Sequence, residues 1–226
     1  MTARVTVRYL TDPACPPDPA RMRLRWLYGD QLEWELRMIV VRERRGSGWP
    51  RQRGSDATLH ACRAVVATGL RWPDRQEAML RRLHVLSQAG ALLDDSDTLE
   101  LAAGQAGLPV AELAAYCAEP EVEQALRAGM RRAACPSYEL LAGDACVDLP
   151  GLRPIEAYEA ALADLEPSLT RRGGPESVDE VLAWAGIPLA TAEVAAVCDR
   201  DDPDVRVELA AAARFEPAGG DGYWSL

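Results

Sequence analysis

The sequence predicts an α/β fold that carries a helical insertion, because three patterns follow one another along its 226 residues. A strand, a short helix and a second strand come first, in residues 4–41. A stretch with helical periodicity follows at 57–130, and a β-hairpin and a last helix complete the order at 137–165. A βαβ unit with so short a helix implies two parallel strands and a right-handed crossover.

The first strand and its helix are separated by a proline-rich loop. Residues 4–10 alternate polar and apolar side chains, which is typical of a strand. The loop TDPACPPDP follows, and its prolines lack the N–H groups that a strand would need. Asp18 and Pro19 fit an N-cap and a first helical position, and Gly29 fits a helix end, so we expect a helix over 19–28.

The second strand and the segment after it differ sharply in character. Residues 31–41 alternate at first and then become wholly apolar, as in a strand that enters a buried sheet. Residues 42–56 are rich in Arg, Gly and Ser, and they fit either a solvated linker or an anion-facing lid. About four helices are expected in 57–130, separated at 69–73, 93–96 and 107–109. A hairpin turn is expected at 143–144.

A second composition begins near residue 176. Residues 176–226 hold eleven acidic residues and three Arg, so they carry −8 of the net charge of −10. Their pattern gives helices at 178–185, 191–198 and 203–213, with Thr191 as a cap of the second, followed by a hairpin-like tail. We therefore expect a small winged-helix-like module at 176–226, beside a larger domain at 1–170.

The charge of that module bears on its partners. The same layout occurs in DNA-binding modules, but the third helix presents Asp202, Asp204 and Glu208 against Arg206 alone. A helix that reads DNA needs donors for phosphates and base edges, so we expect no nucleic-acid partner. An interaction or dimerisation module, for example in a homodimer, fits the acidic surface better.

Composition bounds the class of protein further. No apolar run is long enough for a membrane helix, and residues 1–10 do not resemble a leader, so we expect no membrane partner and no export. The six Cys show no CxxC and no metal-ligand spacing, so neither a metal site nor a disulfide framework is expected from their spacing. Reduced thiols and a cytoplasmic location are the corresponding expectations.

Several segments resemble one family. DPACP at 12–16 resembles the DPxCPWC or DPxCPWS segment of the DsbA-like, FrnE-like and hydroxychromene-carboxylate-isomerase-like proteins, and residues 29–41 look like their second strand. Residues 60–67 and 99–133 resemble the ends of the family's helical insertion, and Cys135-Pro136 falls where the family has its cis-proline. The resemblance spans about residues 4–167 and implies a thioredoxin fold with an all-helical insertion after the second strand.

The resemblance also implies a site, in altered form. It places a reactive thiol at Cys15 and a cis peptide before Pro136, and it puts Cys135 beside Cys15, where the two could form a disulfide; the alternative is that Cys135 is a small buried hydrophobe. The family's second cysteine is absent, and the first helical turn looks deleted. Asp12, Pro16 and Asp18 are the substrate-contact candidates. The prolines lack N–H donors and Asp18 is acidic, so we expect weaker stabilisation of a Cys15 thiolate than in the family.

The other cysteines and the two histidines have simpler interpretations. We expect four Cys to fill the core, at positions 62, 117, 146 and 198, because Ala, Val and Leu surround them. His60 and His84 could each act as a base, but a surface or core role is the more common one for a lone His.

Three functions remain open. The first is a thiol-disulfide oxidoreductase that works through Cys15 with an external thiol or with Cys135, on a small thiol or a protein. The second is a glutathione-dependent isomerase or transferase, in which Cys15 activates bound glutathione. The third is a non-catalytic scaffold that binds a partner in the groove beside Pro136. We expect no cofactor and no metal, with glutathione as the one small molecule that the resemblance brings in.

Overall fold

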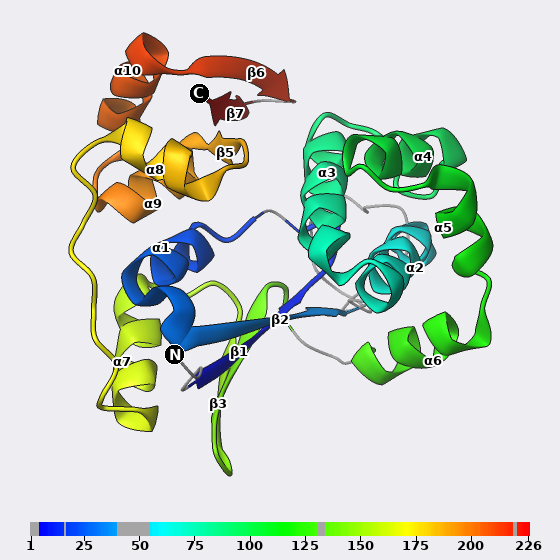
Figure 1. The fold of residues 1–226 in the computed structure, drawn as a ribbon, viewed down its shortest axis with the longest axis horizontal. Helices are drawn as coiled ribbons and strands as arrows, with labels where there is room; N and C mark the ends of the chain where they lie inside the picture. Colours follow the sequence, from blue (N-terminus) through cyan, green and yellow to red (C-terminus); the bar gives the residue numbers. More distant parts are fainter. Residues whose placement is uncertain (1–4, 16, 40–54, 131–133, 219–220) are drawn as a thin grey trace, which may run out of the picture. The chain divides into compact units, whose positions relative to one another are not determined.

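A computed structural model describes residues 5–15, 17–39, 55–130, 134–218 and 221–226, without the side chains of 55–57 (Figure 1). The chain forms two compact units. One consists of residues 1–7, 17–35 and 139–226, and the other of residues 8–16 and 36–138. The expected boundary between a domain at 1–170 and a module at 176–226 stays a prediction.

A four-stranded sheet with the order β2-β1-β3-β4 is built from short alternating segments. Strand β1 spans Val5–Thr11 and β2 spans Leu32–Met38, within one residue of the expected starts. Helix α1 spans Pro19–Tyr28, as predicted. The Asp18 side chain caps it by accepting from the Ala20 N–H, and Gly29 ends it with φ of 53°.

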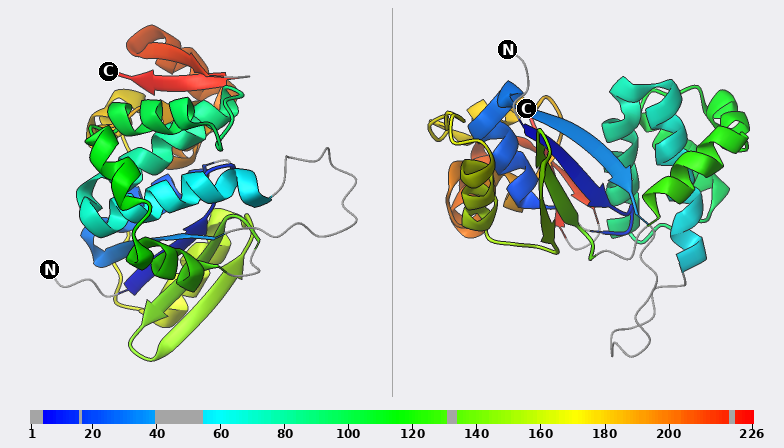
Figure 2. Two further views of the ribbon diagram at one scale, coloured as in Figure 1. Left: turned by 90° about the vertical axis from the view of Figure 1, so that its right-hand side faces the viewer. Right: turned by 90° about the horizontal axis from the view of Figure 1, so that it is seen from below.

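The hairpin and the last helix of this pattern are also confirmed. Strands β3 (Ser137–Ala142) and β4 (Ala145–Pro150) are joined at Gly143 and Asp144 (Figure 2). Gly143 has φ of 56°, which the first central residue of a tight hairpin turn requires and which favours glycine. Helix α7 follows at Ile155–Leu165 and buries Tyr158 and Leu162.

The insertion contains five helices in its described residues rather than the expected four (Figure 1). They are α2 (Ser55–Arg71), α3 (Gln76–Gln88), α4 (Ser96–Gln105), α5 (Val110–Tyr116) and α6 (Pro120–Gly129). The missed boundary lies between α5 and α6, where Pro120 occupies the first position of a new helix. The helices enclose a core that includes Cys62, Val65, Leu83 and Leu126.

The Arg-rich segment cannot be compared with its prediction. Residues 40–54 lie outside the described part of the chain, so the choice between linker and lid stays open there. The last residues of that segment, Ser55 and Asp56, begin α2.

The C-terminal residues form three helices and a small sheet. The elements are α8 (Val178–Ala185), β5 (Leu189–Ala190), α9 (Thr191–Cys198), α10 (Asp202–Ala212), β6 (Arg214–Ala218) and β7 (Asp221–Ser225). The sheet has the order β5-β7-β6 with antiparallel pairs, for example Phe215 opposite Trp224. This helix, strand, two-helix and hairpin order is that of a winged-helix motif.

One cap in this region was predicted wrongly. The N-cap of α9 is Ala190, whose N–H donates to the Glu193 carboxylate at 2.8 Å. The Thr191 hydroxyl instead accepts from the indole N–H of Trp224 at 3.0 Å. Thr191 is needed to satisfy a buried tryptophan, so it starts the helix rather than capping it.

In the described ranges, no helix is long and apolar enough to cross a membrane.

Candidate redox site

Two cysteines that lie 120 residues apart in the sequence form a disulfide. Cys15 lies in the loop between β1 and α1, and Cys135 comes two residues before β3. Their Cα atoms are 6.4 Å apart, inside the range of about 4.4–6.8 Å that a disulfide needs. Both residues are partly exposed. The structure therefore brings together the two cysteines that the resemblance placed side by side.

Asp12 shapes the loop that presents Cys15. Its Oδ1 accepts from the Ala14 N–H at 2.8 Å, and its backbone carbonyl accepts from the Cys15 N–H at 2.9 Å. An Asp side chain that bonds to the N–H two residues on makes an Asx turn, which holds a short loop in one shape. Asp12 is only 4% exposed, and these two hydrogen bonds join it to its own loop. Its role in binding a substrate stays a prediction.

A thiol and an imidazole lie against Asp12 from the helical insertion. The Cys62 thiol, on α2, donates to Asp12 Oδ2 at 3.9 Å, and His84 Nε2, on α3, lies 3.3 Å from the Asp12 carbonyl oxygen. Burial raises the pKa of the Asp12 carboxyl, and hydrogen bonds from Ala14, Thr58 and Cys62 oppose that rise. Burial, and then the nearby Asp12 carboxylate, raise the pKa of the Cys62 thiol well above its ordinary value. Cys62 is thus held as an inert thiol.

The peptide bond between Cys135 and Pro136 is cis, and Pro136 is buried. The Ser137 hydroxyl reaches back across these two residues and donates to the Ala134 carbonyl at 2.5 Å. The hydroxyl of Thr11, at the end of β1, lies 3.9 Å from the Cys135 sulfur. Sequence reasoning did not single out Thr11, because a lone threonine at a strand end has no distinguishing pattern.

The two remaining substrate-contact candidates have different outcomes. Pro16 lies outside the described residues. Asp18 is buried, and besides capping α1 it accepts from the Tyr158 hydroxyl through Oδ2 at 3.4 Å. These contacts explain Asp18 as a helix cap, and its contact with a substrate stays a prediction.

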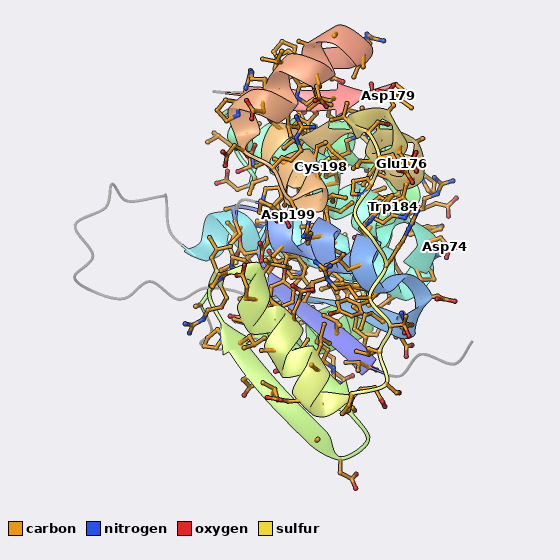
Figure 3. The ribbon with its side chains drawn as sticks, turned by 90° about the vertical axis from the view of Figure 1, so that its left-hand side faces the viewer. Asp74, Glu176, Asp179, Trp184, Cys198 and Asp199 are labelled. Atoms are coloured by element: carbon orange, nitrogen blue, oxygen red, sulfur yellow. A yellow bond between two sulfur atoms is a disulfide. The ribbon has the colours of Figure 1, made fainter. Side chains whose placement is uncertain are left out.

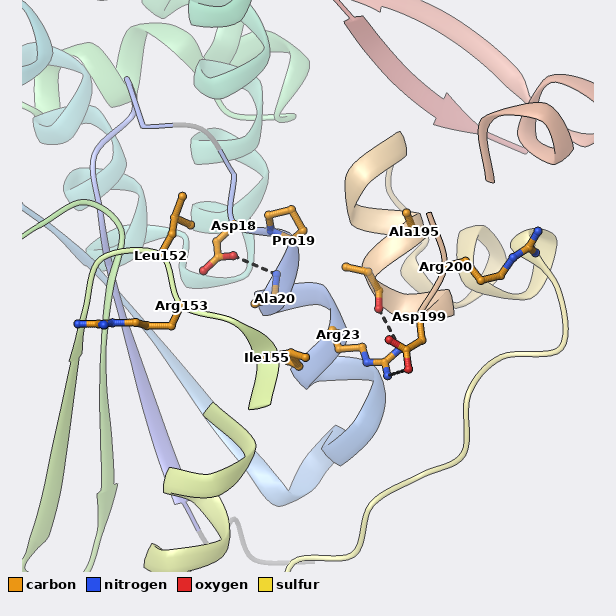
Figure 4. Close-up of a pocket in the computed structure, with 11 residues that line it drawn as sticks. Asp18, Pro19, Ala20, Arg23, Leu152, Arg153, Ile155, Ala195, Asp199 and Arg200 are labelled. Atoms are coloured by element: carbon orange, nitrogen blue, oxygen red, sulfur yellow. Dashed lines mark hydrogen bonds and ion pairs between the residues drawn. The ribbon is translucent and has the colours of Figure 1, made fainter. Parts of the chain in front are cut away.

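A pocket of about 360 Å³ lies at the start of α1 (Figure 4). Its lining includes Pro19 and Ala20 from α1, Ile155 from α7 and Ala195 from α9. Arg23 lines it too, and the guanidinium group donates to the backbone carbonyls of Ala196 and Val197, at 2.9 Å each, while pairing with Asp199 at 2.8 Å. Figure 3 shows Asp199 next to Cys198 at the end of α9. Arg23 therefore caps the C-terminus of α9 from α1.

The other cysteines and the histidines were predicted with mixed success. Cys62 is buried as expected, and Cys117 and Cys198 are half-buried. The prediction for Cys146 is wrong, because it is exposed. It lies next to the hairpin turn on β4, which is an edge strand of the sheet that the described residues form. His60 is exposed, whereas His84 is buried against Asp12.

Among the residues that the structure describes, no group of three or more Cys, His, Asp or Glu could hold a metal ion. The Cys15 and Cys135 sulfur atoms are bonded to each other at this site, and the chemistry that a disulfide offers is thiol-disulfide exchange.

No family model and no curated protein matches the sequence. Similar solved structures include a candidate protein disulfide isomerase from Nitrosomonas europaea, at 18% identity over 71% of this chain and 97% of that one, with a TM-score of 0.55. ScsC from Proteus mirabilis matches at 15% identity, over 72% and 84% of the two chains, with a TM-score of 0.49. A thioredoxin-like oxidoreductase from Silicibacter pomeroyi matches at 19% identity, over 74% and 88%, with a TM-score of 0.48.

At these identities the comparison defines the fold. The match to the Nitrosomonas protein spans nearly all of that chain, and the element order of this chain is that of a thioredoxin fold of the DsbA type, with its helical insertion. The predicted fold class is therefore confirmed, and the site described above lies where this fold brings its first loop and its cis-proline loop together.

Proposed function

We propose that this protein is a thiol-disulfide oxidoreductase of the DsbA type, in which Cys15 and Cys135 together replace the usual pair within one loop. The observation that carries the proposal is the disulfide between them. In one cycle, two external thiols reduce the Cys15–Cys135 bond and leave as one disulfide, and the protein gains two thiols. The reverse reaction oxidises a substrate dithiol.

The arrangement suits exchange with an outside thiol. Cys15 sits in a loop held by the Asp12 turn, and both cysteines are partly exposed, so an attacking thiolate can reach the bond. We propose a small thiol such as glutathione, or a protein thiol, as the reaction partner, and the cytoplasm as the location. The fold comparison supports the same class of chemistry, since proteins described as a disulfide isomerase and as an oxidoreductase share this fold.

The test is a redox titration. The purified protein is equilibrated with mixtures of reduced and oxidised glutathione, quenched in acid, alkylated and analysed by mass spectrometry. The wild type should interconvert between two states that differ by two alkylated thiols. Cys135→Ser should instead collect a glutathione mixed disulfide on Cys15. Cys146→Ser is the matched control, because it removes an exposed thiol outside the pair and should titrate like the wild type.

The other candidate functions are outcomes of the same experiment. A protein that binds glutathione without exchanging its disulfide would have the properties of a glutathione-dependent isomerase or transferase. One that neither exchanges nor binds glutathione, and whose Cys15 reacts no faster than free cysteine, would be a scaffold. Either result would overturn the redox proposal.

A further inference from the structure

The hydroxyl group of Thr11 contacts one sulfur of the disulfide and not the other. Thr11 is fully buried at the end of β1, and its Oγ1 lies 3.9 Å from the Cys135 Sγ. A disulfide sulfur carries no hydrogen, so in the oxidised protein the hydroxyl is the donor. Among the residues that the structure describes, no side-chain donor contacts the Cys15 sulfur, whose residue is held through its backbone N–H to Asp12.

The strength of this contact depends on the charge of Cys135. A buried hydroxyl needs a partner, and a neutral disulfide sulfur is a poor acceptor. A thiolate is a strong acceptor, because hydrogen bonds to charged groups are shorter and about twice as strong as neutral ones. The Thr11 hydroxyl, already in place, would therefore stabilise negative charge that develops on Cys135 when the disulfide opens.

We propose that Thr11 is a further catalytic residue, which stabilises Cys135 as the leaving thiolate and so directs the incoming thiolate to Cys15. This proposal rests on the proposed redox cycle. In the first step a substrate thiolate bonds to the Cys15 sulfur, the Cys15–Cys135 bond breaks, and its electron pair leaves on Cys135. In the second step another substrate thiolate attacks the substrate sulfur of the mixed disulfide, and Cys15 leaves as a thiolate. The two protons released by the substrate thiols end on Cys15 and Cys135.

The contact is tested with a pair of variants that differ by the hydroxyl. Thr11→Val replaces it with a methyl group of similar size, and Thr11→Ser keeps it. In a Cys15→Ser background, iodoacetamide should alkylate Cys135 at pH 7 about threefold more slowly in Thr11→Val. Loss of the hydrogen bond lowers the thiolate fraction about tenfold, and the less stabilised thiolate that remains is about threefold more nucleophilic. Thr11→Ser should restore most of the rate. Urea unfolding of each variant verifies that the fold is intact.

A second measurement needs no substitution at Thr11. The oxidised wild type is mixed with reduced glutathione and quenched in acid at short times, and the mixed disulfide is located by peptide mapping. We expect it on Cys15. Glutathione found mainly on Cys135, or equal alkylation rates in Thr11→Val and Thr11→Ser, would overturn the assignment of Thr11. A disulfide that glutathione does not open at all would instead refute the redox function itself, so the two failures are distinguishable.

Discussion

Arg23 should stabilise the fold far more than the acidic residue with which it pairs. Its side chain is 5% exposed and donates to the carbonyls of Ala196 and Val197 at the end of α9, whereas the side chain of Asp199 is 75% exposed. Arg23→Ala removes both donors from buried carbonyls. At about 1.5–3 kcal/mol for each of the two hydrogen bonds, which involve a charged group, we expect a loss of about 3–6 kcal/mol in the free energy of unfolding.

The matched variant is Asp199→Asn. Asp199 has φ of 59°, a conformation that Asn also adopts readily, so this change keeps the backbone and removes only the charge. An ion pair with one exposed partner contributes little, and we expect a loss below about 1 kcal/mol.

Urea unfolding followed by tryptophan fluorescence provides the comparison, because Trp26 of α1 and Trp184 of α8 pack edge to face at 5.2 Å. Equal losses in the two variants, or a loss below about 1 kcal/mol in Arg23→Ala, would refute the view that Arg23 acts by capping α9.

Three further predictions concern the site and its supports. Cys135→Ser should lower the free energy of unfolding by about 2–5 kcal/mol relative to the oxidised wild type, because it opens a loop of 120 residues; an unchanged urea midpoint would contradict this. Burial raises the pKa of Asp12 in the folded state, so its contribution to stability is present at acidic pH and is lost as the pH rises through that pKa. Asp12→Asn should therefore gain stability relative to the wild type as the pH rises above about 4, the ordinary pKa of an Asp carboxyl, and urea midpoints that shift the other way would contradict this reasoning. Asp18→Ala should lower the free energy of unfolding by about 1 kcal/mol in the same assay, because Ala cannot cap α1. Asp18→Asn should keep most of that stability, because Asn also caps helices; equal losses in the two variants would argue against capping.

The sequence predicted best the elements that begin and end at residues with specific capping roles. Asp18, Pro19 and Gly29 define α1 at both ends, and the predicted range is the observed one. The boundary between α5 and α6 was missed because the Pro120 signal lies within an otherwise continuous helical pattern. Thr191 was misassigned because only the fold reveals Trp224 as the partner of its hydroxyl.

The site was predictable only as far as the resemblance reached. No spacing rule connects Cys15 to Cys135 across 120 residues, and their proximity was expected only from the order of strands in a known fold. The contacts around Asp12 from Cys62 and His84 depend on how α2 and α3 pack, which periodicity does not fix. The exposure of Cys146 depends on the position of β4 at the edge of the sheet, which local sequence cannot encode.

The Cys15–Cys135 bond closes a covalent ring that contains the whole helical insertion. A protease that cuts the backbone once, at any point from residue 16 to residue 134, would leave a single molecule of nearly unchanged mass as long as the bond is closed. Reduction would release two fragments from the same sample. The state of this one bond thus decides whether a nicked chain stays whole, and gel electrophoresis with and without reductant makes that state visible.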